Sequence, residues 1–401
     1  MNPEDKILEF LKAHEPRLLA FLCELVATPS PTPPGDERAV AERIKSELQN
    51  LGLGVPETIA LKPERPNLLL RLNGAKTGRS LILNGHTDTK PAGDLTQWNT
   101  GPFNPVIRDG TLYGLGSTDM KGAVAAMVYA TAALAAVKES INGELQLLLS
   151  ADEEGGSTFG VKYLASQGYL RADAALIGEP SGIRRELEYL DFDSRGILCV
   201  RIRVYGDQMH SSLSDEFDAT NACLKAAELM LKFKTDFQRP GATVNAGVTL
   251  QGGVYFGVVP GLAEFGCDIR VPVGSRESAM RGEIESWLAN CINNDAKLRA
   301  EAIWQSPPSS WIDPVRFPSD HALALALKNA CARVLSDPPK LGCFPGATDA
   351  PWFAAAGVPA VPAFGPGLLP LAHSPNECVR VDSVYACARI YALSALEFLS
   401  A

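Results

Sequence analysis

The sequence has little of what marks several common classes of protein. Only five of its 401 residues are histidine, and its nine cysteines include no Cys-x-x-Cys pair, so a thiolate zinc site is not expected. It also has no run of lysine and arginine, and its formal net charge is −9. Because binding to nucleic acid depends on basic patches, we expect no nucleic-acid partner.

Long apolar runs are missing as well. The longest stretch of low charge, residues 122–137, is rich in alanine and too short to span a bilayer comfortably. Residues 7–26 carry charges at helical spacing, which predicts an amphipathic surface helix. The first residues lack a basic segment leading into an apolar core, so we expect no secretory signal. We therefore expect no association with a membrane.

The remaining composition is that of a globular protein, with 46% hydrophobic and 21% charged residues. The length predicts two domains. Most cysteines lie in apolar contexts, where cysteine behaves as a small buried hydrophobe. This use of cysteine is typical of a reducing compartment, and we expect a cytoplasmic location.

The first half of the chain alternates apolar runs with helical patterns, which is typical of an α/β fold. We predict strands at 67–72, 80–84, 144–150 and 174–178, with helices at 122–137 and 161–167. Acids or histidine directly follow the last three of these strands. Because ligand sites in open α/β sheets lie beyond the carboxyl ends of strands, these strand ends predict one shared site.

From residue 194 the pattern changes. Residues 197–205 alternate strictly, as in a half-exposed strand. The later patterns complete a β-α-β-β-α-β order, with helices at 219–233 and 276–290 and strands at 243–250, 262–271 and 298–304. Beyond the Pro307-Pro308 pair we predict a helix at 322–335, a strand at 358–364 and a helix at 381–399. We expect a discontinuous first domain, 1–193 and 307–401, and an inserted second domain, 194–306.

Two short motifs hold candidate metal ligands. In Gly-His-Thr-Asp at 85–88, His86 and Asp88 are two apart on an extended segment and point the same way. Asp88 can then orient a metal-bound imidazole, although a loop with an incidental histidine is the alternative. The glycine-rich segment 114–122 lacks the lysine and spacing of a phosphate-binding loop. Its Asp119, just before a predicted helix, is either a cap or a ligand.

Three adjacent acids, Asp152, Glu153 and Glu154, follow the strand at 144–150. In a closed site they would repel one another unless cations offset them, and the alternative is a solvated acidic turn. Neighbouring carboxylates can divide the work, one binding a metal and the other accepting a proton from water. Glu179 is held extended by the proline that follows it, and His373 lies in a loop rich in proline and glycine.

Taken together and in this order, the motifs resemble those of the dinuclear zinc aminoacylase/carboxypeptidase family. This family includes acetylornithine deacetylase, succinyl-diaminopimelate desuccinylase, glutamate carboxypeptidase and related dipeptidases. The carrying motifs are Gly-His-Thr-Asp at 85–88, Gly-x-Gly-x-x-Asp-Met-Lys-Gly at 114–122, Asp-Glu-Glu at 152–154, Gly-Glu-Pro at 178–180 and His-Ser-Pro-Asn-Glu at 373–377. The resemblance implies a zinc-peptidase-like catalytic domain, with a mixed sheet flanked by helices, and an inserted two-layer βαββαβ lid and dimerisation domain.

The resemblance also implies roles for individual residues. His86 and Glu179 would hold one zinc ion, Glu154 and His373 the other, and Asp119 would bridge them, with cobalt or manganese as substitutes. Asp88 would orient His86, and Glu153 would be the general base. His210, in the lid, would stabilise the oxyanion in the partner subunit. Arg270, Thr348 and Gly346 would contact the substrate, and Arg270 would bind a carboxylate of the substrate.

We therefore expect a homodimeric hydrolase that cleaves the amide bond of an N-acyl amino acid or a similar small amide. A dipeptidase or glutamate-type carboxypeptidase is the alternative, because it would use the same metal residues. A magnesium phosphoryl-transfer enzyme would prefer carboxylates and water to two histidines. A non-catalytic metal-binding protein would have no need of Glu153.

The sequence departs from the family at one position. Gly257 stands ahead of Val-Val-Pro, where the family usually has the asparagine that helps hold the substrate, so the usual specificity is in question. We expect the two remaining histidines, His14 and His321, to be structural.

Overall fold

The structure is a computed structural model that describes residues 2–304 and 310–400. It divides into two compact units. The first comprises Met1–Asp193, Arg316–Phe344 and Thr348–Ala401, and the second Ser194–Val315 and Pro345–Ala347. The Pro307-Pro308 pair, predicted to mark a boundary, lies outside the described residues.

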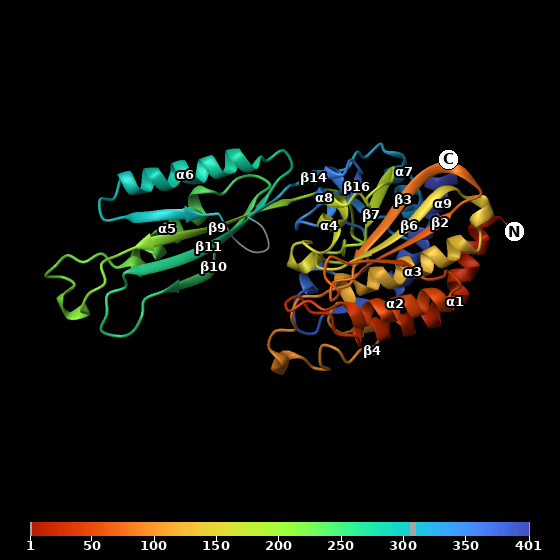
Figure 1. Cartoon of the computed structure of the whole chain (residues 1–401), viewed down its shortest axis with the longest axis horizontal. Coiled ribbons are helices and arrows are strands. Elements are labelled where there is room, and N and C mark those ends of the chain that lie inside the picture. The colour runs from red at the N-terminus through yellow and green to blue at the C-terminus, as the bar shows by residue number, and fades with distance from the viewer. Residues whose placement is uncertain (1, 305–309, 401) are drawn as a thin grey trace. The chain divides into compact units, whose positions relative to one another are not determined.

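The first unit contains a mixed sheet covered by helices (Figure 1). Its helices are α1 (Pro3–Val26), α2 (Arg38–Asn50), α3 (Gly122–Ala135), α4 (Val161–Ser166), α7 (Ala322–Val334), α8 (Ala350–Ala355) and α9 (Val381–Ser400). The strands of the main sheet are β1 (Glu57–Ile59), β2 (Asn67–Asn73), β3 (Lys76–His86), β6 (Asn142–Ser150), β7 (Ala174–Ile177) and β16 (Ala360–Val361).

Among the described residues these six strands follow the order β1-β2-β6-β3-β7-β16. Strands β6, β3, β7 and β16 run parallel, whereas β2 is antiparallel to β6 and β1 is antiparallel to β2. Smaller sheets join β14 (Val315–Arg316), β8 (Tyr189–Ser194) and β15 (Lys340–Phe344), and β17 (Cys378–Arg380), β5 (Thr111–Tyr113) and β4 (Val106–Arg108).

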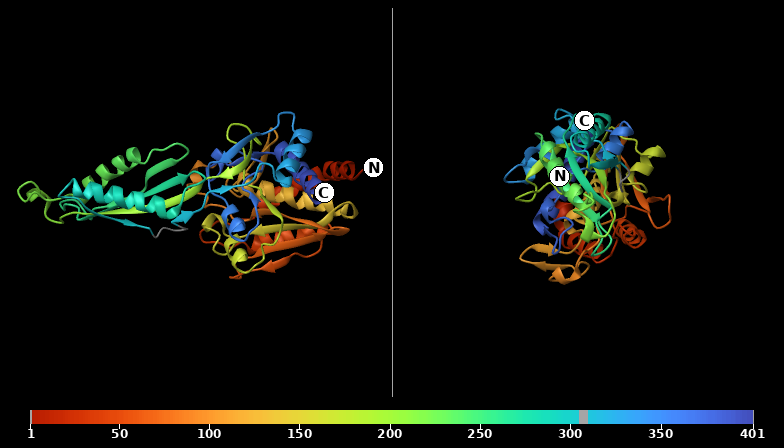
Figure 2. Two further views of the ribbon diagram at one scale, coloured as in Figure 1. Left: turned by 90° about the horizontal axis from the view of Figure 1, so that it is seen from above. Right: turned by 90° about the vertical axis from the view of Figure 1, so that its left-hand side faces the viewer.

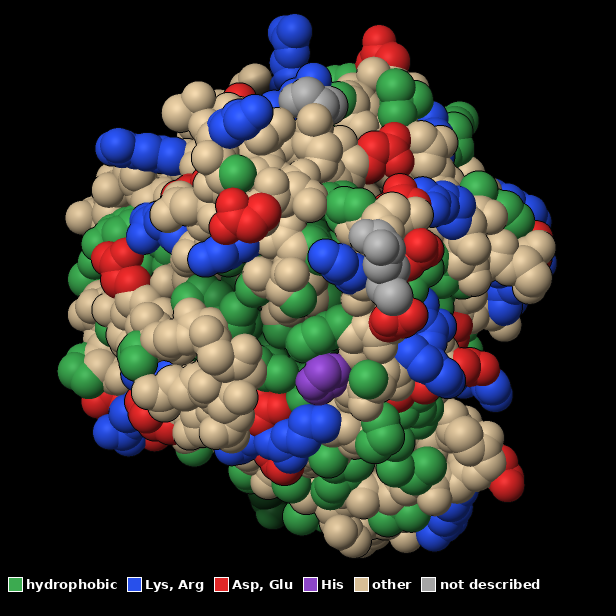
Figure 3. All heavy atoms as spheres, turned by 90° about the vertical axis from the view of Figure 1, so that its right-hand side faces the viewer, with side chains coloured by type: hydrophobic (Ala, Val, Ile, Leu, Met, Phe, Trp, Pro, Cys, Tyr) green, Lys and Arg blue, Asp and Glu red, His purple; other side chains and the backbone are tan. Residues whose placement is uncertain are grey.

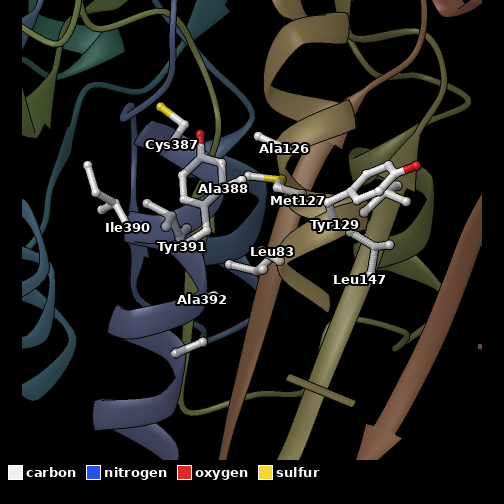
Figure 4. Packing of buried hydrophobic residues seen from close by; sticks show 14 of the residues in the cluster. Leu83, Ala126, Met127, Tyr129, Leu147, Cys387, Ala388, Ile390, Tyr391 and Ala392 are labelled. Carbon is white, nitrogen blue, oxygen red and sulfur yellow. The ribbon is translucent and has the colours of Figure 1, made fainter. Parts of the chain in front are cut away.

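The core of the first unit lies between this sheet and helices α1, α3, α7 and α9. Leu83 of β3 and Leu147 of β6 are at most 1% exposed and belong to the same cluster as Tyr129 of α3 and Tyr391 of α9 (Figure 4). The alanine-rich α3 is buried on nearly every side, which explains why its sequence shows no polar face.

Most predicted elements of the first unit are confirmed, but their bounds differ. The predicted strand 80–84 extends over Lys76–His86, and the predicted strand 358–364 is only Ala360–Val361. The short length of β16 follows from its edge position, where it pairs with β7 alone. Helix α2 and strand β8 were not predicted from the sequence.

The second unit is the two-layer arrangement predicted from the sequence. Its elements are β9 (Gly196–Tyr205), α5 (Ala222–Asp236), β10 (Thr243–Gly252), β11 (Leu262–Val271), α6 (Glu277–Asn293), β12 (Arg299–Ile303) and β13 (Trp311–Ile312). The described strands follow the order β10-β11-β9-β12, with β13 also paired to β9. Alternate residues of β9 are buried, and α5 and α6 pack with them in one cluster on one face of the sheet (Figure 2).

The surface and the cysteines agree with the composition. On the face drawn in Figure 3, acidic and basic side chains are interspersed rather than gathered by sign. All nine cysteines are free thiols. Among the described helices, none is both long and apolar enough to cross a membrane.

Candidate metal centre

Three neighbouring strand ends build the centre. Strands β6, β3 and β7 are parallel neighbours, so their carboxyl ends meet at one edge of the sheet. His86 ends β3 and lies opposite Ser150, which ends β6. The acidic turn that holds Glu153 and Glu154 follows β6, and Glu179 follows β7. The topology thus brings together the side chains that the sequence placed after these strands.

Asp119 reaches the same edge from the segment that precedes α3. A Cβ atom added at Gly85 would lie 3.0 Å from Met120 Cε, and one added at Gly178 would lie 2.8 Å from Ala123 Cβ. Glycine at both strand ends therefore lets this segment pack closely against the sheet. Asp119 has φ −123° and ψ 94°, outside the helical region, and it does not cap α3. The alternative that Asp119 is an N-cap is wrong.

The candidate ligands form two groups that share Asp119. In the first, His86 Nε2 lies 2.9 Å from Asp119 Oδ1 and 3.7 Å from Glu179 Oε1. In the second, His373 Nε2 lies 3.1 Å from Asp119 Oδ2 and 2.8 Å from Glu154 Oε1. Within each group the ligand atoms lie within 4.8 Å of one another. Each oxygen of Asp119 thus faces a different histidine.

The charges in the centre are strongly coupled. Burial opposes a charge on His373, but the carboxylates of Asp119 and Glu154 raise its pKa to about 11. Burial likewise opposes a charge on His86, yet Asp119 and Asp88 raise its pKa well above the usual value. Burial raises the pKa of Glu179, and the charge of Asp119 adds to this. The acids therefore stabilise any positive charge brought to this edge.

This donor set fits divalent metal ions. Each group offers one imidazole and two carboxylates, which are ligands that zinc and other first-row metals accept. Except for His373, whose side chain is 44% exposed, the members of both groups are buried. Buried carboxylates at this density need cations to offset their repulsion. The alternative of a solvated acidic turn is wrong for Glu154, which is buried.

Asp88 supports both the histidine and the acidic turn. His86 Nδ1 lies 3.0 Å from the carbonyl oxygen of Asp88 and 3.5 Å from its carboxylate Oδ1. The carboxylate also accepts hydrogen bonds from the backbone N–H groups of Glu153 at 3.1 Å and Glu154 at 3.2 Å. Asp88 therefore links the end of β3 to the turn after β6, a second contact that the sequence did not suggest.

A buried arginine lies beneath the acidic turn. Arg65 Nη2 is 2.7 Å from Asp152 Oδ1, 2.8 Å from Glu37 Oε1 and 3.9 Å from Asp88 Oδ2. Its side chain is 6% exposed, and both of its nearest partners are buried. Arg65 and Glu37 were not predicted from the sequence, because neither lies near the acidic turn in the chain and neither belongs to a recognised motif.

Glu377 holds the backbone at Asp119, as Asp88 holds the backbone of the acidic turn. Its Oε1 accepts hydrogen bonds from the backbone N–H groups of Thr118 at 2.9 Å and Asp119 at 3.0 Å. Burial raises the pKa of Glu377 to about 8. Glu377 belongs to the His-Ser-Pro-Asn-Glu motif at 373–377, so the segment that contributes His373 also fixes the backbone of the shared ligand.

Glu153 lies beside the two groups without belonging to either. Burial raises its pKa well above the ordinary value; His86 opposes this shift, whereas Asp349 and Glu154 add to it. Asp349 is buried and accepts a hydrogen bond from the Ser157 hydroxyl. A carboxyl group whose pKa is raised holds a proton more readily, so it can accept one and return it.

The other predicted site residues belong to neither ligand group. His210, in the second unit, is exposed, and its Nδ1 lies 2.8 Å from Ser212 Oγ. The Arg270 guanidinium already makes a two-point contact with Asp268, at 2.9 and 3.0 Å. Thr348 accepts a hydrogen bond from Ala350 N–H at the start of α8, and Gly346 is half-buried.

Three further positions singled out in the sequence have clear local explanations. Gly257 has φ +80°, a region that glycine adopts freely and asparagine tolerates, so glycine fits where the family usually has asparagine. His14 lies 2.7 Å from the carbonyl oxygen of Phe10 and stacks on its ring. His321 caps α7 by accepting Leu323 N–H. His14 and His321 are thus structural, as predicted.

Comparison with known proteins places the chain in a family. Residues 82–397 match the model of peptidase family M20/M25/M40. A succinyl-diaminopimelate desuccinylase of Stenotrophomonas maltophilia is 28% identical over 388 residues, which cover 93% of this chain and 97% of the relative. One from Polynucleobacter necessarius is 29% identical over 386 residues, covering 92% of this chain and 95% of the relative.

Solved structures share the fold. An M20 family metallo-carboxypeptidase from Sulfolobus solfataricus has a TM-score of 0.75 at 20% identity, covering 96% of this chain and 99% of that one. A Bacillus subtilis protein described as a dinuclear metal-binding peptidase from the M20 family has a TM-score of 0.67 at 17% identity, covering 97% and 99%. The chain therefore belongs to peptidase family M20/M25/M40 and is a metal-dependent hydrolase of amide bonds.

Proposed function

We propose that this enzyme is a dinuclear zinc deacylase that removes the acyl group from an N-acyl amino acid, with an N-succinyl compound as the first candidate substrate. One observation carries the proposal: two ligand groups, each with one histidine, share Asp119 at the end of the parallel strands. The names of the relatives that span nearly the whole chain support the choice of substrate.

His86 and Glu179 would hold one zinc ion, Glu154 and His373 the other, and Asp119 both. When bound, the metal pair supplies Lewis-acid chemistry, which makes a water more acidic and a carbonyl more electrophilic. Asp88 orients His86 and holds the turn that carries Glu153. Glu153 accepts the proton of the attacking water and returns it to the nitrogen of the leaving amine, so that the amide yields a carboxylate and an amine.

The second unit would act as a lid and dimerisation domain in a homodimer. In that assembly His210 donates a hydrogen bond to the developing oxyanion of the partner subunit, and Arg270, Thr348 and Gly346 contact the substrate. The exposure of His210 supports this role, because its ring is available to a ligand. Sedimentation of the active protein tests the assembly, and a fully active monomer would exclude it.

We also propose that the native metal is zinc, with cobalt or manganese as functional substitutes, and that the enzyme works in the cytoplasm. The imidazole and carboxylate ligands suit zinc. Nine free cysteines are in keeping with a reducing compartment.

A substrate panel tests the proposed function. Zinc- or cobalt-loaded protein is assayed with N-succinyl-diaminopimelate, N-acetylornithine, other N-acyl amino acids and dipeptides. The proposal predicts the highest kcat/KM for an N-acyl amino acid. A clear preference for dipeptides would instead assign the same centre to a peptidase, and no hydrolysis of any amide would refute both.

A further inference from the structure

Lys90 is a cation that lies beside the ligand Glu154. It has no role in the proposed mechanism. It lies four residues after His86, which ends β3. Its ammonium group donates a hydrogen bond to the Glu154 carbonyl oxygen and lies 3.1 Å from Glu154 Oε2. Because these contacts involve backbone as well as side chain, Lys90 is held at a fixed place beside the second ligand group.

The other described cations near the acidic turn are enclosed by protein. Arg65 is 6% exposed and is bonded to Glu37 and Asp152. Lys121 is fully buried and donates to the carbonyl oxygens of Leu25 at 2.9 Å and Thr28 at 2.8 Å. Their burial therefore keeps these two cations away from a ligand in solution.

Lys90 differs from them in its exposure. Its side chain is 36% exposed, beside the exposed ligand His373 at 44%, and both contact Glu154. The remaining ligands are buried, so a substrate meets the centre on the side where Lys90 and His373 lie. An ammonium group has three N–H donors, and the two contacts with Glu154 leave one of them for another acceptor.

We propose that Lys90 binds a carboxylate of the substrate and so sets the preference of the enzyme for anionic substrates. A deacylase substrate offers two such groups, the free carboxylate of a dicarboxylic acyl group and the α-carboxylate of the amino acid. Arg270, also proposed to contact the substrate, has its guanidinium paired with Asp268, whereas Lys90 lies directly beside the ligand Glu154. This inference rests on the proposed function, because it concerns the substrate of that reaction.

Paired substrates test the inference. Wild-type, Lys90→Met and Lys90→Arg proteins are assayed with an N-succinyl amino acid, its succinamoyl analogue, in which the acyl carboxylate is an amide, and its α-carboxamide. For the substrate with both carboxylates, Lys90→Met should lower kcat/KM about 10-fold or more, mainly through KM, because a charge-assisted hydrogen bond is lost. Lys90→Arg should recover most of this loss.

The neutral analogues identify the carboxylate. If Lys90 binds the acyl carboxylate, Lys90→Met should change kcat/KM for the succinamoyl compound less than about threefold. If Lys90 binds the α-carboxylate, Lys90→Met should instead change kcat/KM little for the α-carboxamide. Equal losses for all three compounds would overturn the inference, because Lys90 would then only brace the acidic turn. Lys45, which pairs with Glu42 at 2.7 Å on α2, supplies the control Lys45→Met, which should leave all three values unchanged.

A binding measurement separates this inference from the proposed function. Calorimetric titration of the metal-loaded protein with succinate and with a free amino acid requires no turnover. Lys90→Met should weaken the binding of whichever carboxylate Lys90 holds by about the factor seen in kinetics. Unchanged affinities for both would overturn the inference. A wild-type protein that hydrolyses none of the amides would instead refute the proposed function.

Discussion

Removing Arg65 should destabilise the protein far more than removing a surface arginine. Arg65 is 6% exposed and contacts Glu37 Oε1 at 2.8 Å, Asp152 Oδ1 at 2.7 Å and Thr32 Oγ1 at 3.0 Å. Arg65→Met would leave two buried carboxylates without their cation. Breaking a buried ion pair from one side costs about 3–5 kcal/mol, and we expect a loss of this size in the free energy of unfolding at pH 8.

The loss should shrink at lower pH. Burial and the charge of Asp88 raise the pKa of Glu37 to about 8 even with Arg65 present, against a usual value of 4.5. A raised folded-state pKa gives stability that is present below pH 4.5 and is lost as the pH rises toward 8. Without Arg65 this pKa should rise further, so the cost of Arg65→Met should grow with pH, through Glu37 by up to about 0.4 kcal/mol between pH 5 and pH 8 and by more above pH 8.

Urea unfolding at the two pH values measures this effect. Arg71, which is 39% exposed and paired with Glu57 at 3.0 Å, gives the matched control Arg71→Met, with an expected loss of at most about 1 kcal/mol. The double variant Arg65→Met/Glu37→Met should recover part of the stability, since it removes one of the two buried carboxyl groups left without a partner. A loss below about 1 kcal/mol for Arg65→Met at pH 8 would show that Arg65 is no more important to stability than a surface arginine.

Two further predictions concern catalysis and stability. Glu153→Gln should keep the metal content of the wild type and lower kcat by about 10²–10⁴-fold, because the proton acceptor is lost; near-normal turnover would show that another group is the base. Burial raises the pKa of Asp191 to about 7 from a usual 3.8, so its contribution to stability falls as the pH rises through this range. Relative to wild type, Asp191→Asn should therefore gain roughly 3 kcal/mol between pH 5 and pH 8 in urea unfolding. An unchanged difference would mean that Asp191 titrates normally.

Local patterns predicted much of the fold. The alternation of residues 197–205 predicted β9, and the order of elements in the second unit followed from similar patterns. The end of β16 was misplaced because residues 362–364 are buried in an apolar segment that continues no ladder, and Ala363 forms only an isolated bridge with Asp191. Periodicity reports burial, and it cannot distinguish a buried strand from a buried connection.

The candidate ligands were also readable from sequence, because each lies in a short motif beside a strand or helix. Of the groups that support them, only Asp88, two residues after His86, was predicted. Arg65 and Glu37 meet the acidic turn only through tertiary contacts, and Glu377 acts on Asp119 across 258 positions of sequence. Such partners are set by the packing of distant segments, which neither spacing nor composition encodes.

The most direct test of the account is the metal content of purified protein and of three variants. We expect one ion for each of the two ligand groups in the wild type, measured by elemental analysis after dialysis. Glu179→Gln and Glu154→Gln should each weaken one ion selectively, whereas Asp119→Ala should release both, because its two oxygens face different histidines. A wild type that binds a single ion, or an Asp119→Ala protein that keeps two, would contradict a shared dinuclear centre.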